Sequence, residues 1–337
     1  MAEHRGRARP AQLPGHVGVL VLLALGGPVP VCSAQAPPSA VPDLVSAVDA
    51  ARLYADACAA CHGARGDGRG PAARGLGLPR PRDFTAGVFK FRTTPSGSLP
   101  SDQDLFRTIS QGVAGTWMPA WGTRLTEAEC WALVRYIKSF APTFRTEAPD
   151  PPVPLPSPPG RSRELISEGP WVYAVLGCAQ CHGERGRGNG PSARRLSDDY
   201  GDPIRPYDFT RGAYKNGGSP EALYRTLRTG LSGTPMPALE PSVLAYAGGA
   251  NADVAGLRRR LPPAEFDGAA TYLTREPNAA ELAAMSPAAL DALVERRLWA
   301  LVYYIQSLER RPSLPYRLLR EDAEAAVGAA RTAAGKP

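Results

Sequence analysis

The chain has 337 residues, of which 43% are hydrophobic and 21% charged, with a formal net charge of +7 at pH 7. This length gives room for two domains that each bury a core, and the composition excludes both a disordered chain and a membrane bundle. Lysines and arginines are scattered and form no basic stripe interleaved with aromatic residues, so no nucleic-acid binding is expected.

Residues 1–36 have the layout of a secretory signal peptide. Three arginines precede an apolar run over residues 17–25, and small residues follow at 33–36. The run is far shorter than the ~20 residues that span a bilayer, and Pro30 and Val31 do not suit lipidation of Cys32. We therefore expect a periplasmic protein in an oxidising compartment, with no stable membrane span in its mature form.

A proline-rich linker divides the rest of the chain. Seven of the eleven residues from Pro149 to Pro159 are proline, which excludes helix and favours an extended, semi-rigid spacer. The predicted order is one domain over 45–142, a linker over 143–162, a second domain over 163–311 and a tail over 312–337.

The two predicted domains are repeats of one sequence pattern. Both contain Cys-Ala-x-Cys-His-Gly, Gly-Pro, Asp-Phe-Thr, Gly-Thr-x-Met-Pro-Ala and Trp-Ala-Leu-Val-x-Tyr-Ile-x-Ser in the same order. The second domain differs by an insertion of about 50 residues, at about 241–290, whose composition suggests short helices. We infer duplication of one ancestral domain.

The predicted regular secondary structure is helical, with Gly- and Pro-rich loops between the helices. Apolar residues recur at i, i+3, i+4 and i+7 in the closing segments 131–140 and 299–308, and Thr126 with Glu129 forms a capping box before the first of them. Further helices are expected from about Asp49, from about Arg163, and over 102–111 and 220–229. No segment has a convincing β period, so the fold class is all-α.

The two CxxCH segments predict covalent haem. Cys58 and Cys61, with His62, and Cys178 and Cys181, with His182, can each form two thioether bonds to a porphyrin edge and place the histidine under the iron. A zinc site would need four ligands where each motif offers three. A redox dithiol would not explain a histidine at the next position in both repeats. The predicted cofactors are therefore two haem c groups with their iron.

The residue inventory predicts the ligand on the other side of each iron. The other two histidines, His4 and His16, lie in the signal segment. Met118 and Met236 occupy equivalent places in the repeat, 56 and 54 residues after the motif histidines. We therefore predict His/Met ligation of both irons, which raises the reduction potential and leaves no position open for a substrate. The expected role is transfer of single electrons, without catalysis.

These motifs resemble those of class I cytochrome c domains, and the whole chain resembles exported di-haem cytochromes c built from two such domains. The resemblance implies a small all-α bundle whose first and last helices cross near the haem. It also implies that the carbonyl groups of Pro71 and Pro191 accept a hydrogen bond from the proximal histidines. Tyr54 lies four residues before its motif but Tyr173 lies five before, which leaves open a different helix crossing in the second domain.

The sequence leaves two possible roles for several other residues. Cys130 reads as a small buried residue, since Leu298 matches it in the second domain; the alternative is a thiolate ligand. Trp117 and Trp121 flank Met118 and are candidates for packing on the haem edge or in the core. The remaining candidates are arginines that could pair with haem propionates or lie in solvent: Arg82, Arg92 and Arg205.

Three functions compete. The favoured one is electron transfer between a membrane oxidoreductase and a periplasmic acceptor, as a free shuttle or as the cytochrome subunit of a larger complex. A di-haem peroxidase needs a peroxide-accessible iron and usually a spare histidine, which this sequence lacks. A haem-based gas sensor needs a five-coordinate iron. The expected partners are redox proteins.

Overall fold

The computed structural model describes residues 46–245, 258–259, 263–273 and 276–310. Within them the regular structure is helical, and the β pairing is limited to one isolated bridge between Ser197 and Pro203. The all-α prediction is confirmed. The predicted signal segment and C-terminal tail lie outside the described residues.

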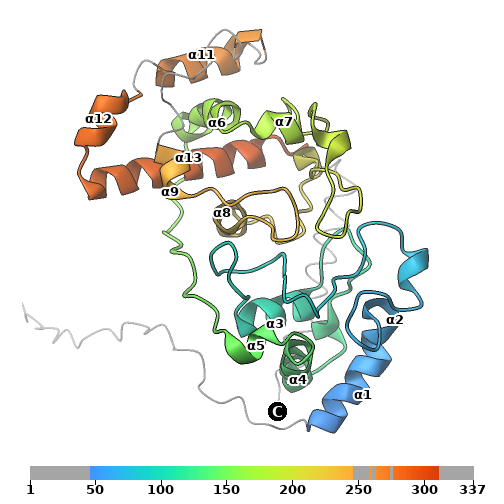
Figure 1. The fold of residues 1–337 in the computed structure, drawn as a ribbon. Coiled ribbons are helices and arrows are strands. Elements are labelled where there is room, and N and C mark those ends of the chain that lie inside the picture. The colour runs from blue at the N-terminus through green and yellow to red at the C-terminus, as the bar shows by residue number, and fades with distance from the viewer. Residues whose placement is uncertain (1–45, 246–257, 260–262, 274–275, 311–337) are drawn as a thin grey trace, which may run out of the picture. The chain divides into compact units, whose positions relative to one another are not determined.

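The first lobe, residues 46–142, is built on helices that bury their apolar faces against one another. Helix α1 (Ala47–Ala57) and helix α3 (Asp102–Gln111) both pack against α4 (Glu127–Lys138), as Figure 1 shows. A serine or threonine hydroxyl caps the start of each helix, and the predicted capping box of Thr126 and Glu129 is present. The shorter elements are α2 (Ala59–His62), η1 (Ala73–Gly75), η2 (Trp121–Thr123) and, at the start of the linker, α5 (Thr143–Thr146).

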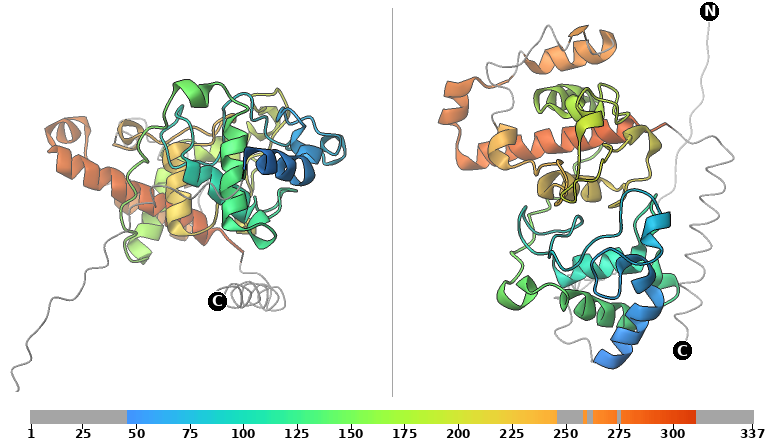
Figure 2. Two further views of the ribbon diagram at one scale, coloured as in Figure 1. Left: turned by 90° about the horizontal axis from the view of Figure 1, so that it is seen from below. Right: turned by 45° about the vertical axis from the view of Figure 1, so that its right-hand side comes forward.

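The second lobe, residues 163–310, repeats this plan. Helix α6 (Arg163–Val175) packs along α13 (Pro287–Ser307), as α1 packs on α4, and α8 (Pro220–Thr229) takes the place of α3 (Figure 2). The helices predicted over 102–111 and 220–229 are confirmed at both ends. The short elements are α7 (Cys178–His182), η3 (Ala193–Arg195) and η4 (Phe209–Arg211).

The described part of the insertion forms three short helices before α13. They are α9 (Pro241–Ala245), α11 (Pro263–Leu273) and α12 (Ala279–Ala284). Helix α11 packs on α6, where the Tyr272 hydroxyl donates to the carbonyl of Glu164 at 2.6 Å. The buried Arg297 of α13 donates to the carbonyls at the end of α9 at 2.6 and 2.7 Å. The insertion is thus anchored to both long helices of the second lobe.

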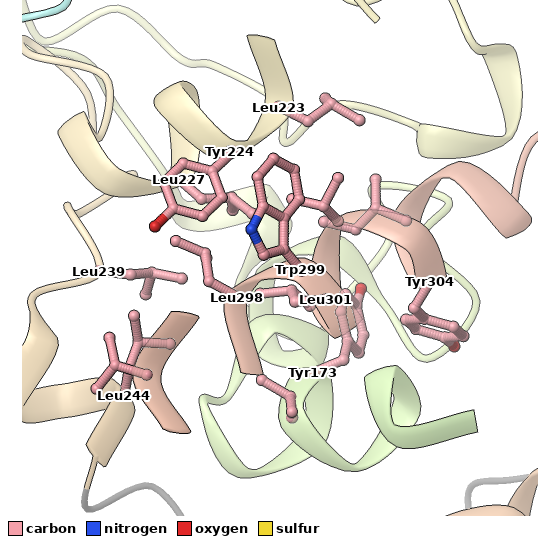
Figure 3. Packing of buried hydrophobic residues seen from close by; sticks show 14 of the residues in the cluster. Tyr173, Leu223, Tyr224, Leu227, Leu239, Leu244, Leu298, Trp299, Leu301 and Tyr304 are labelled. Atoms are coloured by element: carbon pink, nitrogen blue, oxygen red, sulfur yellow. The ribbon is translucent and has the colours of Figure 1, made fainter. Parts of the chain in front are cut away.

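The core of the second lobe is aromatic and aliphatic. In Figure 3 the Trp299 ring lies beside that of Tyr224, and their centroids are 4.5 Å apart. Leu298 and Leu301 on the same helix are fully buried. Cys130, which matches Leu298 in the repeat, is 1% exposed in the core of the first lobe, and burial raises the pKa of its thiol. The reading of Cys130 as a buried core residue is confirmed.

Replacing Leu298 with alanine should lower the free energy of unfolding by about 2–5 kcal/mol, because the side chain is lost from a site that cannot collapse fully. Denaturant unfolding followed by helical circular dichroism measures this change. Leu155→Ala is the matched control, since Leu155 is 37% exposed in the linker. Equal midpoints for the two variants would contradict the assigned core.

The linker is extended, as its prolines require. No helix occurs between Thr146 and Arg163. The Val153 amide donates to the carbonyl of Thr93 at 2.8 Å, and the Tyr303 hydroxyl donates to the carbonyl of Pro159. The linker is therefore bonded to both lobes. Among the described helices, none is long and apolar enough to cross a membrane.

Candidate functional site: two CxxCH centres

Both CxxCH segments form a short helix that follows the first helix of their lobe. The Tyr54 hydroxyl donates to the carbonyl of Gly63 at 2.8 Å, and the Tyr173 hydroxyl donates to that of Gly183 at 2.7 Å. The tyrosine therefore has the same bond in both lobes, despite its different spacing from the motif. The extra residue of the second lobe is taken up at Gly177, whose φ of 70° separates α6 from α7.

None of the four motif cysteines is in a disulfide. Burial raises the pKa of Cys58 and that of Cys178 to about 12, so both thiols are protonated at neutral pH. Each pair lies within one helical turn. This arrangement leaves both sulfur atoms of a motif available for thioether bonds on one edge of a porphyrin.

One ring nitrogen of each motif histidine is held by a backbone carbonyl. Nδ1 of His62 lies 3.0 Å from the carbonyl oxygen of Arg82, and Nδ1 of His182 lies 3.1 Å from that of Tyr207. With the proton on Nδ1, Nε2 is the nitrogen that would bind a metal. Burial lowers the pKa of both histidines, which favours the neutral imidazole that a metal needs.

The predicted role of Pro71 and Pro191 is wrong, because the carbonyl partners of the histidines are Arg82 and Tyr207. The Gly-Pro segments instead pack on the motif helix. The amide of Gly70 donates to the carbonyl of Cys61 at 3.1 Å, and the residue after Pro71 donates to the carbonyl of Ala60 at 2.8 Å. The second lobe has both equivalent bonds, at 3.1 and 2.9 Å. These prolines therefore lie in a loop that fixes the cysteine turn.

The repeated Asp-Phe-Thr segment is the part of the site that sequence reasoning missed. The carboxylate of Asp83 accepts hydrogen bonds from the amide and hydroxyl of Thr85, at 2.8 and 2.6 Å, and so closes a turn. Phe84 stacks on His62 with centroids 4.4 Å apart, and Phe209 stacks on His182 at the same distance. The turn presents the preceding carbonyl to the histidine and packs an aromatic ring on its face. Its recurrence in both repeats was the available signal.

Each candidate methionine lies in a loop that closes on itself through hydrogen bonds. The amide of Val113 donates to the carbonyl of Met118 at 3.1 Å, and the amide of Met118 donates to Oγ1 of Thr116 at 3.1 Å. The loop of Met236 has the same two bonds, at 3.1 and 3.2 Å. The threonine of the Gly-Thr-x-Met-Pro-Ala frame thus fixes the methionine backbone.

A glycine at the start of each methionine loop allows this closure. Gly112 has a φ of 67° and Gly230 a φ of 63°. A Cβ atom would lie 2.5 Å from the backbone of Pro119 in the first case and 2.6 Å from that of Ala238 in the second. Because both the φ and the close approach exclude side chains, the loops are built around these two positions.

The remaining predicted residues lie in different environments. Trp117 is 72% exposed, whereas Trp121 is half-buried against the core of the first lobe. Arg205 is exposed. Arg82 forms an ion pair with Asp199, at 3.3 Å. Arg92 is 1% exposed and donates hydrogen bonds to neutral protein groups. The side chains of Arg82 and Arg92 are therefore both bonded to other protein groups.

Two lysines at equivalent repeat positions were not predicted. Burial, together with the nearby charges of Arg82 and Lys215, lowers the pKa of Lys90 to about 8. Burial also lowers the pKa of Lys215. The signal for them was a lysine that follows an aromatic residue in both repeats. The positive charges of these two lysines are suited to binding a carboxylate group.

The residues of both centres fit a covalently bound haem. Each centre offers two cysteines outside any disulfide, a histidine whose Nδ1 is already hydrogen-bonded, and a preformed methionine loop. A zinc site needs four ligands, and the described residues contain no group of three or more His, Cys, Asp and Glu side chains that could hold a metal ion. When bound, haem supplies an iron that cycles between the ferric and ferrous states. The fold and the site together define a c-type cytochrome.

Comparisons with known proteins agree with this class. Residues 46–137 match the family described as cytochrome c oxidase, cbb3-type, subunit III. The chain is similar to a chain in the structure of the reducing HAO-like protein complex Kustc0457/Kustc0458 of Kuenenia stuttgartiensis, with 36% identity and a TM-score of 0.61. That similarity covers 80% of this chain and 100% of the other. The chain belongs to the c-type cytochromes, with a cytochrome c domain of the cbb3 subunit III family.

A second relative is the cbb3-type cytochrome c oxidase subunit FixP of Azorhizobium caulinodans. It is 26% identical over 190 residues, which are 56% of this chain and 51% of FixP. The chain thus spans about half the length of this curated relative.

Proposed function

We propose that this protein is a periplasmic di-haem cytochrome c that passes single electrons between redox partners. His62 and Met118 would ligate one iron, and His182 and Met236 the other. The observation that carries the proposal is the paired construction of both centres, in which a histidine held through Nδ1 and a self-closed methionine loop recur in each repeat.

This ligand set favours electron transfer over catalysis. Two protein ligands leave no iron position open to peroxide or a gas, and a thioether favours ferrous over ferric iron, which raises the potential. Export to the periplasm is proposed from the layout of residues 1–36. The relation to an oxidase subunit and to a chain of a protein complex supports a role as the cytochrome subunit of an oxidoreductase, with a free shuttle as the alternative.

A redox titration of the purified protein tests the function. It should show two one-electron waves, and the reduced protein should neither turn over hydrogen peroxide nor bind carbon monoxide rapidly. Rapid peroxide turnover would contradict the proposal and favour a di-haem peroxidase.

The surface beside Met118 is the proposed docking site for one partner. Trp117 and Leu78 are 72% and 52% exposed, and Nε1 of Trp117 donates to the carbonyl of Leu76 at 3.2 Å, so the two apolar side chains belong to one region. Two exposed arginines, Arg69 and Arg74, occur in the same part of the chain. This combination fits a partner with an acidic rim around an apolar centre. Pro235 stands at the position of Trp117 in the second lobe, so the site belongs to the first lobe.

Replacing Trp117 with alanine should slow electron exchange with a carboxylate-terminated electrode at least several-fold, while the reduction potentials stay unchanged. Film voltammetry measures both quantities. Val243→Ala is the matched control, because Val243 is 50% exposed in α9 of the second lobe. Equal exchange rates for the two variants would place the docking surface elsewhere.

A further inference from the structure

The loop that carries Met236 is bonded to a buried arginine of the first lobe. Nη2 of Arg92 donates to the carbonyl of Thr229, the last residue of α8, at 2.8 Å, and Nη1 donates to Oγ of Ser232. Within its own lobe Arg92 also donates to the carbonyls of Pro95 and Phe89, at 3.1 and 3.3 Å. Because Arg92 is 1% exposed, these bonds are shielded from water.

A second contact reaches the same loop through Asp199. The amide of Asp199 donates to the carbonyl of Gly233 at 3.2 Å. Its carboxylate pairs with Nη1 of Arg82 at 3.3 Å, and Nη1 also donates to the hydroxyl of Tyr200 at 3.2 Å. That hydroxyl accepts the amide of Asp83 at 2.9 Å as well. The turn at 82–83 of the first lobe is thus bonded to the segment that supports the Met236 loop.

Arg82 contributes to both centres. Its carbonyl oxygen accepts the hydrogen bond from Nδ1 of His62, while its side chain pairs with Asp199. The same residue therefore orients the proximal ligand of the first centre and supports the loop of the distal ligand of the second.

The loop of Met118 is supported differently. The hydrogen bonds that involve residues 112–120 in the described part of the chain all stay within the first lobe. The loop's bond to Leu76, made by the exposed side chain of Trp117, also lies within the first lobe. The two methionine loops have the same internal bonds but different surroundings.

We propose that Arg82 and Arg92 are positioning residues for the second iron, which hold the Met236 loop from the first lobe and so set the strength of the iron–methionine bond there. The inference rests on the proposed His/Met ligation. A thioether is a neutral ligand that must be held against competitors by its loop, and mutation of the groups that orient a metal ligand typically costs about 10–100-fold in metal affinity or activity. Met118, held within its own lobe, should not respond to these arginines.

Paired variants separate the two irons. In Met118→His protein the near-infrared iron–methionine band reports Met236 alone, and in Met236→His protein it reports Met118 alone. Arg92→Gln is added to each haem-loaded protein, and imidazole is titrated against the band. With Arg92→Gln, displacement of Met236 should need roughly tenfold less imidazole, and displacement of Met118 should need the same amount as before. Asp199→Asn should act in the same direction, and Arg205→Gln, an exposed arginine, should change neither titration.

Each result of these imidazole titrations either supports or overturns the proposed role of the two arginines. Equal weakening of both methionine bonds would show general destabilisation, and an unchanged Met236 bond would show that the first lobe does not position it; either result overturns the proposal. If Met118→His alone abolishes the band, Met236 is not a ligand, and the proposed function fails instead. If Arg92→Gln protein does not fold, the Asp199→Asn titration decides, because this carboxylate is partly exposed and its loss leaves no buried cavity.

Discussion

Replacing Cys178 and Cys181 with alanine is expected to remove the covalent haem of the second lobe and to leave that of the first. Without both thiols no thioether bond can form, and haem held only by His182 and Met236 would separate in denaturant. Mass spectrometry of the denatured chain should show the mass of one haem, and haem staining of a denaturing gel should fall to about half.

The matched control for this variant is Cys130→Ala. Cys130 carries a free thiol but lies in the core of the first lobe, outside both motifs. This variant should keep two haems. Loss of haem from it, or full haem content in the double-cysteine variant, would contradict the assignment of the motifs.

Replacing Met118 or Met236 with histidine is expected to lower the potential of one haem and to remove half of the near-infrared band. Imidazole stabilises ferric iron better than a thioether does, and axial ligands set haem potentials over a range of ~0.8 V. A titration of each variant should show one wave shifted to lower potential by a substantial part of that range and one wave near its original position. Met285→His is the control, because Met285 ends α12 in the insertion. An unchanged band in both ligand variants would refute the ligand assignment.

The sequence predicted the helices and the ligand candidates because their signals are local or countable. The hydroxyl caps and apolar periods of α3 and α8 lie within one segment, and both helices have the predicted bounds. With two histidines outside the signal segment and two methionines at equivalent repeat positions, the candidates could be counted directly. Cys130 was interpreted correctly because Leu298 matches it in the second repeat.

The acceptor for the proximal histidine could not be predicted in the same way. This acceptor is a backbone carbonyl, which any residue carries. The family resemblance implied the carbonyl of Pro71, whereas the turn of Asp83 and Thr85 presents the carbonyl of Arg82. The spacing of Tyr173 left the helix crossing of the second lobe open, and one left-handed glycine absorbs the extra residue.

The contacts between the two repeats could not be predicted from the sequence either. Arg82 and Arg92 were interpreted as haem-facing or solvated, but each also bonds to residues more than 100 positions away in the other repeat. Duplication makes the two centres alike in their internal bonds, and the contacts between repeats then make them different.

The most direct test of the central claim is the near-infrared absorption of the oxidised protein, measured per chain against its haem content. Two iron–methionine bonds per chain predict a band twice that of a cytochrome with a single His/Met haem, at two haems per chain. A band of half that size, or none, at the same haem content would show an iron without its sulfur ligand and would contradict the account.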